Sequence, residues 1–137
     1  MPRPRRTWVY NPPKPPVPKV PADVKVAVQD QAHRLIETDL KPQHIEPPPR
    51  DARFNYLVDI SARWYRHYFY FHATYASPGP NAIAPFFEAK FARMEYVGER
   101  RFDLAFMRHT GAWVVLYHGL SHNECFEHIR DDPFFHP

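Results

Sequence analysis

The chain has 137 residues, of which 44% are hydrophobic and 16% aromatic, so it can bury the core of one domain and is not globally disordered. Its formal net charge is +3, but residues 1–21 hold five basic residues and no acidic one, which leaves two net negative charges on the remainder. The body of the chain therefore lacks the strongly basic character of a domain that binds nucleic acid through charge alone.

The composition also limits the compartment in which the protein is expected. No apolar run has the length of a membrane span, and the N-terminus lacks the apolar segment of a secretory signal. The single cysteine, Cys125, excludes an intramolecular disulfide. We therefore expect a cytoplasmic protein that has no membrane partner.

Residues 1–21 are predicted to form a basic, proline-rich arm that precedes a single domain at residues 22–137. Eight of the 17 prolines fall in this arm, which favours an extended backbone. Three of its basic side chains are candidates for contacts with phosphates, and Trp8 and Tyr10 are candidates for docking on a partner or on a second copy. The alternative is a solubilising tail. The candidate phosphate ligands are Arg3, Arg5 and Arg6.

Residues from Asp23 to Leu40 are predicted to form an amphipathic helix, with Asp23 at the N-cap position and Pro42 ending the helix. The apolar residues that recur at helical spacing are Val24, Val28, Ala32, Leu35, Ile36 and Leu40.

The rest of the chain is predicted to be mostly β-structure. Alternating residues indicate strands at 54–60, 62–75, 86–97, 101–108 and 112–118, with a turn near residues 61–62. A capping box from Ser121 to Glu124 predicts a short C-terminal helix. The expected fold class is α+β, an antiparallel sheet of about five strands whose helices cover one face.

The segment 62–75 is the most informative stretch because it is dense in aromatic residues. If it is one strand, its even-numbered positions form one face on which every side chain carries a polar tip or a charge. Such a face could stack unpaired bases. The alternative is that a helix or the arm covers it as a second core layer. The candidate residues are Trp64, Arg66, Tyr68, Tyr70 and His72.

Two arginines on neighbouring predicted strands, Arg93 and Arg108, are further candidates for phosphate contacts. Acidic residues interleave with the basic ones between positions 86 and 108. The alternative interpretation is therefore a solvated face of cross-strand ion pairs.

An enzymatic function has one remote indication. Glu88-Ala89-Lys90 has the Glu-x-Lys form of metal-dependent nucleases, and Asp59 could supply a second carboxylate. The motif is too short to be specific. The nine histidines show no compact spacing for zinc, and Cys125 falls on the apolar face of the last helix, so we expect no metal site, no cofactor and no cysteine nucleophile.

The C-terminal third carries a pattern similar to that of a family of small bacterial proteins of unknown function. Its first motif, Ala-Arg-x-x-Tyr, matches Ala92–Tyr96, and its second, Gly-x-Trp, matches Gly111–Trp113. The resemblance implies that these two motifs pair in a hairpin followed by a helix with an Asp-Pro stop. It implies no catalytic residue.

The sequence therefore predicts a non-enzymatic binding or accessory protein. Its leading partner is single-stranded nucleic acid, held by the aromatic strand and the basic arm. The competing hypothesis is a protein-interaction or dimerisation module that uses Trp8, Tyr10 and the prolines around them.

Overall fold

The computed structural model describes residues 16–50 and 53–137. Its elements follow the predicted order of a helix, five strands and a short helix, so the α+β fold class is confirmed. They are α1 (Ala22–Leu35), a π-helical segment η1 (Ile36–Leu40), α2 (Lys41–His44), β1 (Tyr56–Tyr65), β2 (Tyr68–Ala76), β3 (Phe86–Gly98), β4 (Arg101–Met107), β5 (Trp113–Leu120), α3 (His122–Asp131) and a 3-10 turn η2 (Pro133–Phe135).

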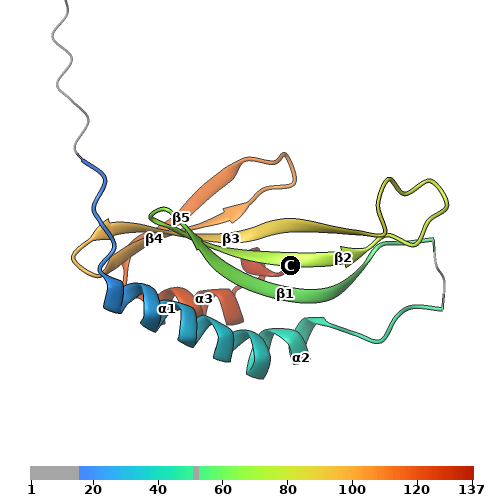
Figure 1. Cartoon of the computed structure of the whole chain (residues 1–137), viewed down its shortest axis with the longest axis horizontal. Coiled ribbons are helices and arrows are strands. Elements are labelled where there is room, and N and C mark those ends of the chain that lie inside the picture. The colour runs from blue at the N-terminus through green and yellow to red at the C-terminus, as the bar shows by residue number, and fades with distance from the viewer. Residues whose placement is uncertain (1–15, 51–52) are drawn as a thin grey trace, which may run out of the picture.

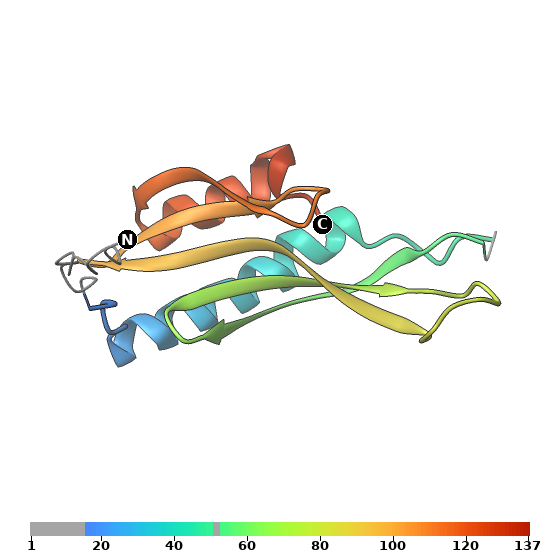
Figure 2. The same cartoon turned by 90° about the horizontal axis from the view of Figure 1, so that it is seen from above.

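The five strands form one antiparallel sheet in the order β1-β2-β3-β4-β5. Each strand pairs with the next one in the chain, so the sheet is a simple meander. The helices lie together on one side of this sheet (Figure 1). The same arrangement is seen from above in Figure 2, where α1 and α3 lie behind the strands.

The core fills the space between the sheet and the helices. α1 and the segment after it contribute an apolar stripe, and β2 contributes Phe69, Phe71 and Ala73, all fully buried. Aromatic rings on β3 and β4 and residues of α3 close the core beneath the second half of the sheet. The helical stripe consists of Val24, Val28, Ala32, Leu35, Ile36 and Leu40.

The first helix begins and ends at different residues from those predicted. Pro21 is the N-cap, and no side chain caps the helix. Asp23 pairs with Arg100 instead (2.7 Å). Pro42 does not end the helix, which continues to His44. The π-helical segment directly before Pro42 widens the backbone, and this relieves the clash that a proline ring makes with a preceding helical carbonyl.

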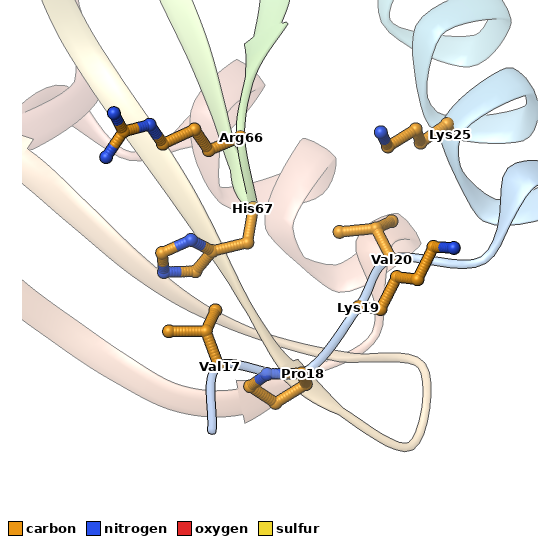
Figure 3. A pocket seen from close by; sticks show the side chains of 7 residues that line it. All are labelled: Val17, Pro18, Lys19, Val20, Lys25, Arg66 and His67. Carbon is orange, nitrogen blue, oxygen red and sulfur yellow. The ribbon is translucent and has the colours of Figure 1, made fainter. Parts of the chain in front are cut away.

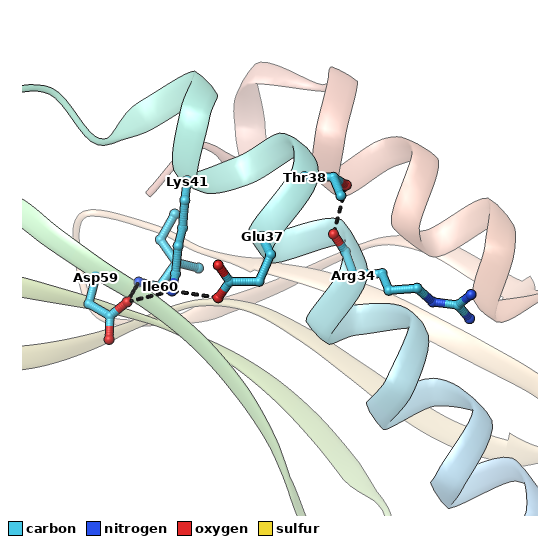
Figure 4. A network of polar contacts seen from close by, with 6 residues as sticks. All are labelled: Arg34, Glu37, Thr38, Lys41, Asp59 and Ile60. Carbon is cyan, nitrogen blue, oxygen red and sulfur yellow. Dashed lines mark hydrogen bonds and ion pairs between the residues drawn. The ribbon is translucent and has the colours of Figure 1, made fainter.

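A polar network fastens this helical end to the edge of the sheet. Lys41 Nζ lies 2.6 Å from Glu37 Oε1 and 3.2 Å from Asp59 Oδ1, so one ammonium group joins two carboxylates on different elements (Figure 4). Asp59 Oδ1 also accepts a hydrogen bond from the backbone N–H of Ile60. The pKa of Lys41 is raised, chiefly by its hydrogen bond to Glu37.

The prediction of one unbroken strand over residues 62–75 is wrong. β1 ends at Tyr65 and β2 begins at Tyr68, so Arg66 and His67 form a two-residue hairpin turn. Arg66 adopts a left-handed backbone with φ of 55°, a conformation that glycine or asparagine usually supplies in such turns. Neither residue occurs here, so no residue of this segment predicts the turn. The turn that was expected near residues 61–62 is absent, because β1 runs through these positions.

The C-terminal helix begins as predicted. Ser121 Oγ accepts from the backbone N–H of Glu124, and Glu124 Oε1 accepts from the backbone N–H of Ser121, which completes the capping box. Cys125 is fully buried, and burial raises the pKa of its thiol to about 12. The thiol is therefore core rather than a nucleophile.

Of the predicted arm, the structure describes residues 16–21. Val20 is 6% exposed and joins the core, while Val17 remains mostly exposed. The proposed boundary at residue 21 therefore lies just beyond a residue that packs with the domain. In the described part of the chain, no helix is long and apolar enough to cross a membrane.

Candidate binding face

The face of the sheet opposite the helices has no helix or further strand over it among residues 16–50 and 53–137 (Figure 2). Alternation along β2 places Tyr68, Tyr70 and His72 on this face, because Phe69 and Phe71 between them point into the core. β3 and β5 add two cations and an indole. We call this set the uncovered cluster: Tyr68, Tyr70, His72, Lys90, Arg93 and Trp113.

A β-bulge in β3 brings the two cations to the same face. Lys90 lies opposite His72, and the register then shifts so that Ala92 lies opposite Phe71. Strict alternation would place Lys90 and Arg93, three positions apart, on opposite faces. The extra residue of the bulge removes that difference. The sequence contains no signal for this bulge, so it does not predict that Lys90 and Arg93 share a face.

Arg93 lies between two aromatic rings. Its guanidinium carbon is 5.1 Å from the ring centroid of Tyr68 and 4.9 Å from that of Trp113. Ala105 of β4 lies directly opposite Arg93 and is 1% exposed. Because Ala105 has only a methyl side chain, Arg93 of β3 and Trp113 of β5 can meet above the strand that separates them.

Arg93 has no acidic partner within the described residues. Its Nε is buried and forms no hydrogen bond. A guanidinium group presents several N–H donors in a fixed plane, so rings alone cannot satisfy it. The cation is thus held in place by aromatic contacts, and its remaining donors are available to an acceptor from outside.

Tyr70 forms the centre of the uncovered cluster. Its ring centroid lies 5.7 Å from that of Tyr68, 5.8 Å from that of Trp113 and 6.3 Å from that of His72. Lys90 Nζ lies 4.3 Å from the same ring centroid. These neighbours leave Tyr70 only 9% exposed. Tyr70 therefore supports the surface, whereas Tyr68 and Trp113 are half-buried and keep accessible ring area.

His72 is the most deeply buried member, with 4% of its surface exposed. Burial, and then the charge of Arg63, lower the pKa of this imidazole, which is therefore neutral near neutral pH. Its Nδ1 lies 3.7 Å from Glu88, and Glu88 is held by Arg63 at 2.9 Å. The hydrogen bond from Arg63 lowers the pKa of Glu88, so this ion pair borders the cluster in its charged form.

The turn side of the cluster is closed by His67 and Glu95, whose Nε2 and Oε2 atoms lie 3.1 Å apart. The His67 ring also packs against Tyr68, with ring centroids 4.0 Å apart. Burial and the nearby carboxylate of Glu95 raise the pKa of Tyr68, so its hydroxyl stays protonated and can donate a hydrogen bond.

Two predicted site residues lie elsewhere. Trp64 is on the helix side, where it packs against Phe69 and donates its Nε1 hydrogen to the carbonyl of Lys25 at 3.1 Å. The hairpin turn reversed its face relative to Tyr68. Arg66 is in that turn, with its guanidinium carbon 5.3 Å from the Tyr65 ring centroid.

Arg108 follows β4 at the turn into β5 and is exposed. It is not part of the uncovered cluster. The remaining predicted residues lie outside the part of the chain that the structure describes: Arg3, Arg5, Arg6, Trp8 and Tyr10.

A shallow pocket of about 350 Å³ lies where the described end of the arm meets the β1–β2 turn. Val17 and Pro18 form one wall, and Arg66 and His67 form another (Figure 3). Lys25 reaches toward this pocket from α1, but the ammonium group of Lys19 points away from it. The charged groups do not converge on one point, so they are not arranged to bind an anion together.

The residues of the nuclease hypothesis are engaged with cations. Glu88 pairs with Arg63, and Asp59 pairs with Lys41. Among the described residues, no group of three or more His, Cys, Asp or Glu side chains is placed to hold a metal ion. The geometry therefore gives this alternative no support.

The resemblance motifs occupy β3 and β5, two strands that are separated by β4. Arg93 is on β3 and Trp113 at the start of β5, and β4 lies between them, so the two motifs do not form one hairpin. They meet instead through the contact of Arg93 with Trp113.

The fold and the uncovered cluster define a small α+β protein with a helix layer on one side of an antiparallel meander and an aromatic, cationic surface on the other. The chain belongs to the family described as Domain of unknown function (DUF3024), whose model matches residues 17–137. No curated protein and no solved structure matches it.

Proposed function

We propose that this protein is a non-enzymatic binding protein whose uncovered cluster holds single-stranded nucleic acid. One observation carries the proposal. Arg93 is fixed between the rings of Tyr68 and Trp113, and it has no acidic partner within the described residues. A phosphate oxygen satisfies such a guanidinium group, while the neighbouring rings are suited to bases.

The charges around the cluster favour an anionic ligand at Arg93. The acidic residues of this face are each engaged by a basic or imidazole group: Glu88 by Arg63, Glu95 by His67 and Asp103 by His118. Lys90 lies on Tyr70 and, within the described residues, pairs with no carboxylate. The imidazoles of His67 and His118 neutralise a carboxylate only when they are protonated. Lys90 and Arg93, which contact the rings, are the cations of the uncovered cluster without a carboxylate partner in the described residues.

The two half-buried rings set the expected contribution of stacking. Each base stacked on an aromatic side chain contributes about 1–3 kcal/mol, so Tyr68 and Trp113 could supply most of the binding free energy. Bases in a duplex are already stacked on one another, so only an unpaired strand can use both rings. This favours single strands over duplex.

The proposal changes the set of residues that the sequence hypothesis placed on the aromatic face. Lys90 and Trp113 join Tyr68, Tyr70, His72 and Arg93, while Trp64 leaves the set. We also propose that the motifs Ala92–Tyr96 and Gly111–Trp113 mark this face in the family, because they contain Arg93 and Trp113. Contacts from the arm through Arg3, Arg5 and Arg6, and the alternative of a protein partner for Trp8 and Tyr10, stay predictions.

The test is fluorescence anisotropy of a labelled single-stranded oligonucleotide with the full chain. The variant Lys90→Gln/Arg93→Gln removes both cations of the cluster. Its matched control, Lys25→Gln/Arg34→Gln, removes the same two charge types from the exposed side of α1. We expect the first variant to bind at least about tenfold more weakly and the control to bind like the wild type.

Salt dependence then separates the face from the arm. For single strands, the logarithm of the binding constant falls with a slope of about −0.7 per phosphate contact, so one or two contacts at the cluster give a slope between about −0.7 and −1.4. A markedly steeper slope would indicate that the arm supplies most contacts. Absence of binding at low salt, or equal loss in both variants, would overturn the proposal.

A further inference from the structure

The first half of β3 is an unpaired sheet edge. Pairing with β4 runs from Ala92 opposite Phe106 to Gly98 opposite Arg101, whereas residues 86–90 pair only with β2, and Phe91 is the extra residue of the bulge. In the described residues, no other strand lies along them. A strand edge with free N–H and C=O groups is a template for a further strand.

This edge differs from the two outer edges of the sheet. Residues 86–90 are exposed at five consecutive positions, and Phe86 and Phe87 are 57% and 42% exposed. The outer edge of β1 is partly engaged by the helices, because Gln29 donates to the carbonyl of Ala62. The outer strand β5 is disturbed by two register shifts in its pairing with β4.

We propose that a second copy of this chain pairs antiparallel with residues 87–91 of β3 and joins the two sheets. The side chains of this segment alternate between the two faces of the sheet. Phe87, Ala89 and Phe91 lie on the helix side, whereas Glu88 and Lys90 lie on the uncovered side. A two-fold axis that makes the sheet continuous is perpendicular to it and keeps each face on its own side.

The two-fold axis limits the possible registers. Residues opposite one another must lie on the same face, so the axis passes beside a residue that lies opposite its own copy. In the middle of the segment 87–91, this residue is 88, 89 or 90. An axis at Glu88 or at Lys90 would place that residue opposite itself, with like charges in contact. An axis at Ala89 places Glu88 opposite Lys90 of the second copy, in both directions.

The same register also pairs apolar side chains on the helix side of the sheet. With the axis at Ala89, Phe87 lies opposite Phe91 of the second copy, and two alanines face one another at the centre. Phe91 is already at the margin of the core, 7% exposed. Phe87 is exposed and, among the residues that the structure describes, stacks on Tyr75 alone, at a ring-centroid distance of 5.4 Å. Pairing would therefore bury a phenylalanine against the core of each partner.

The inference goes beyond the proposed function and does not depend on it. Arg93, Tyr68 and Trp113 lie outside the paired segment and stay accessible in the dimer. Lys90 faces Glu88 of the second copy, so Arg93 is the cation of the uncovered cluster that remains for a ligand. Both uncovered clusters would then lie on the same side of one continuous sheet, within reach of one strand of nucleic acid.

Sedimentation equilibrium of the full chain over a roughly hundredfold concentration range tests the inference. We expect a monomer–dimer equilibrium for the wild type. Glu88→Lys alone, or Lys90→Glu alone, places like charges opposite one another twice per dimer and should raise the dissociation constant at least about tenfold. The double variant Glu88→Lys/Lys90→Glu restores opposite charges and should restore the dimer.

Two controls make the result specific. Glu127→Lys and Arg34→Glu reverse the same charges on exposed helical positions and should leave the dimer unchanged. Circular dichroism of each variant checks that it is folded, because Glu88 also pairs with Arg63. A monomer at every concentration, a dimer that tolerates both single reversals, or a double variant that stays monomeric would each overturn the inference.

Discussion

Arg93 and its two rings show how a residue can be placed by its neighbours rather than by its own strand position. The guanidinium group contacts rings from β2 and β5, which lie on opposite sides of the strand that carries it. The contact depends on a small residue, Ala105, at the intervening position. A change at Arg93 should therefore affect the stability of the sheet as well as binding.

We predict that Arg93→Met lowers the free energy of unfolding by about 1–2 kcal/mol, because two cation–ring contacts of about 0.5–1 kcal/mol each are lost. Urea unfolding followed by circular dichroism measures this change. Arg34→Met, which removes an exposed arginine from α1, is the control and should change stability little. Equal stability of both variants would show that the rings do not hold Arg93.

His72 gives a prediction for pH. Burial lowers its pKa below the ordinary value of 6.5, so the unfolded chain binds a proton before the folded one does. Stability is therefore full above pH 6.5 and is lost as pH falls from 6.5 through the folded pKa. The pKa values of His44 and His122 are lowered by burial too, so they contribute in the same direction.

We therefore predict that His72→Gln reduces the loss of stability between about pH 7.5 and about pH 5.5 without abolishing it. Urea unfolding at both pH values, for the wild type and the variant, measures the difference. The hydrogen bond from Arg63 lowers the pKa of Glu88, so this neighbouring carboxylate stays charged over the same range. An unchanged difference would mean that His72 is not the titrating group.

At the scale of elements, the sequence predicted those features that depend on residues close together in the chain. The capping box at Ser121 defined the start of α3, and the helical spacing of apolar residues defined the buried stripe of α1. Both signals depend on residues a few positions apart. The same local signals failed at Pro42, because a π-helical segment accommodates the ring, and at Asp23, because Arg100 draws its carboxylate away.

The capping box allows a direct test of its contribution. Ser121→Ala removes the acceptor for the backbone N–H of Glu124 and should lower the free energy of unfolding by about 1 kcal/mol. Thermal or urea unfolding measures it. Glu127→Ala, which changes an exposed residue of the same helix, is the control. Since α3 supplies Cys125, Phe126 and Ile129 to the core, the loss should appear in the global transition.

Turns and bulges explain why the candidate site was predicted only in part. The Arg66–His67 turn has no glycine or asparagine, so Trp64 was placed with Tyr68 although it packs on the helix side. The bulge between Lys90 and Ala92 likewise has no sequence signature. Each event moves all later side chains to the other face, because alternation has a period of two. Tyr68, Tyr70 and His72 nevertheless share one face of the strand, as the alternation predicted.

At the scale of the whole molecule, the meander could be predicted because consecutive strands pair with one another. The layer order followed from the apolar faces of the helices. What the sequence could not give is the length of each pairing. β4 stops short of the first half of β3, and this leaves the edge on which the proposed dimer depends.

The two sides of the sheet differ in what they carry. The helix side is the core, in which Trp64 is fixed by its hydrogen bond to Lys25, whereas the other side carries Trp113 beside Arg93. These two indole groups are natural reporters, because one lies on each side of the sheet. Of these two indole groups, a ligand on the uncovered face should contact that of Trp113 and not that of Trp64.

The most direct test of the binding face is a ¹⁵N chemical-shift titration of the full chain with an unlabelled single-stranded oligonucleotide. We expect the indole N–H signal of Trp113 and the amide signals of Tyr68, Tyr70 and Arg93 to shift when ligand is added. The indole N–H signal of Trp64 should not shift. Shifts confined to the helices and Trp64, or no shifts in the sheet at saturating ligand, would contradict it.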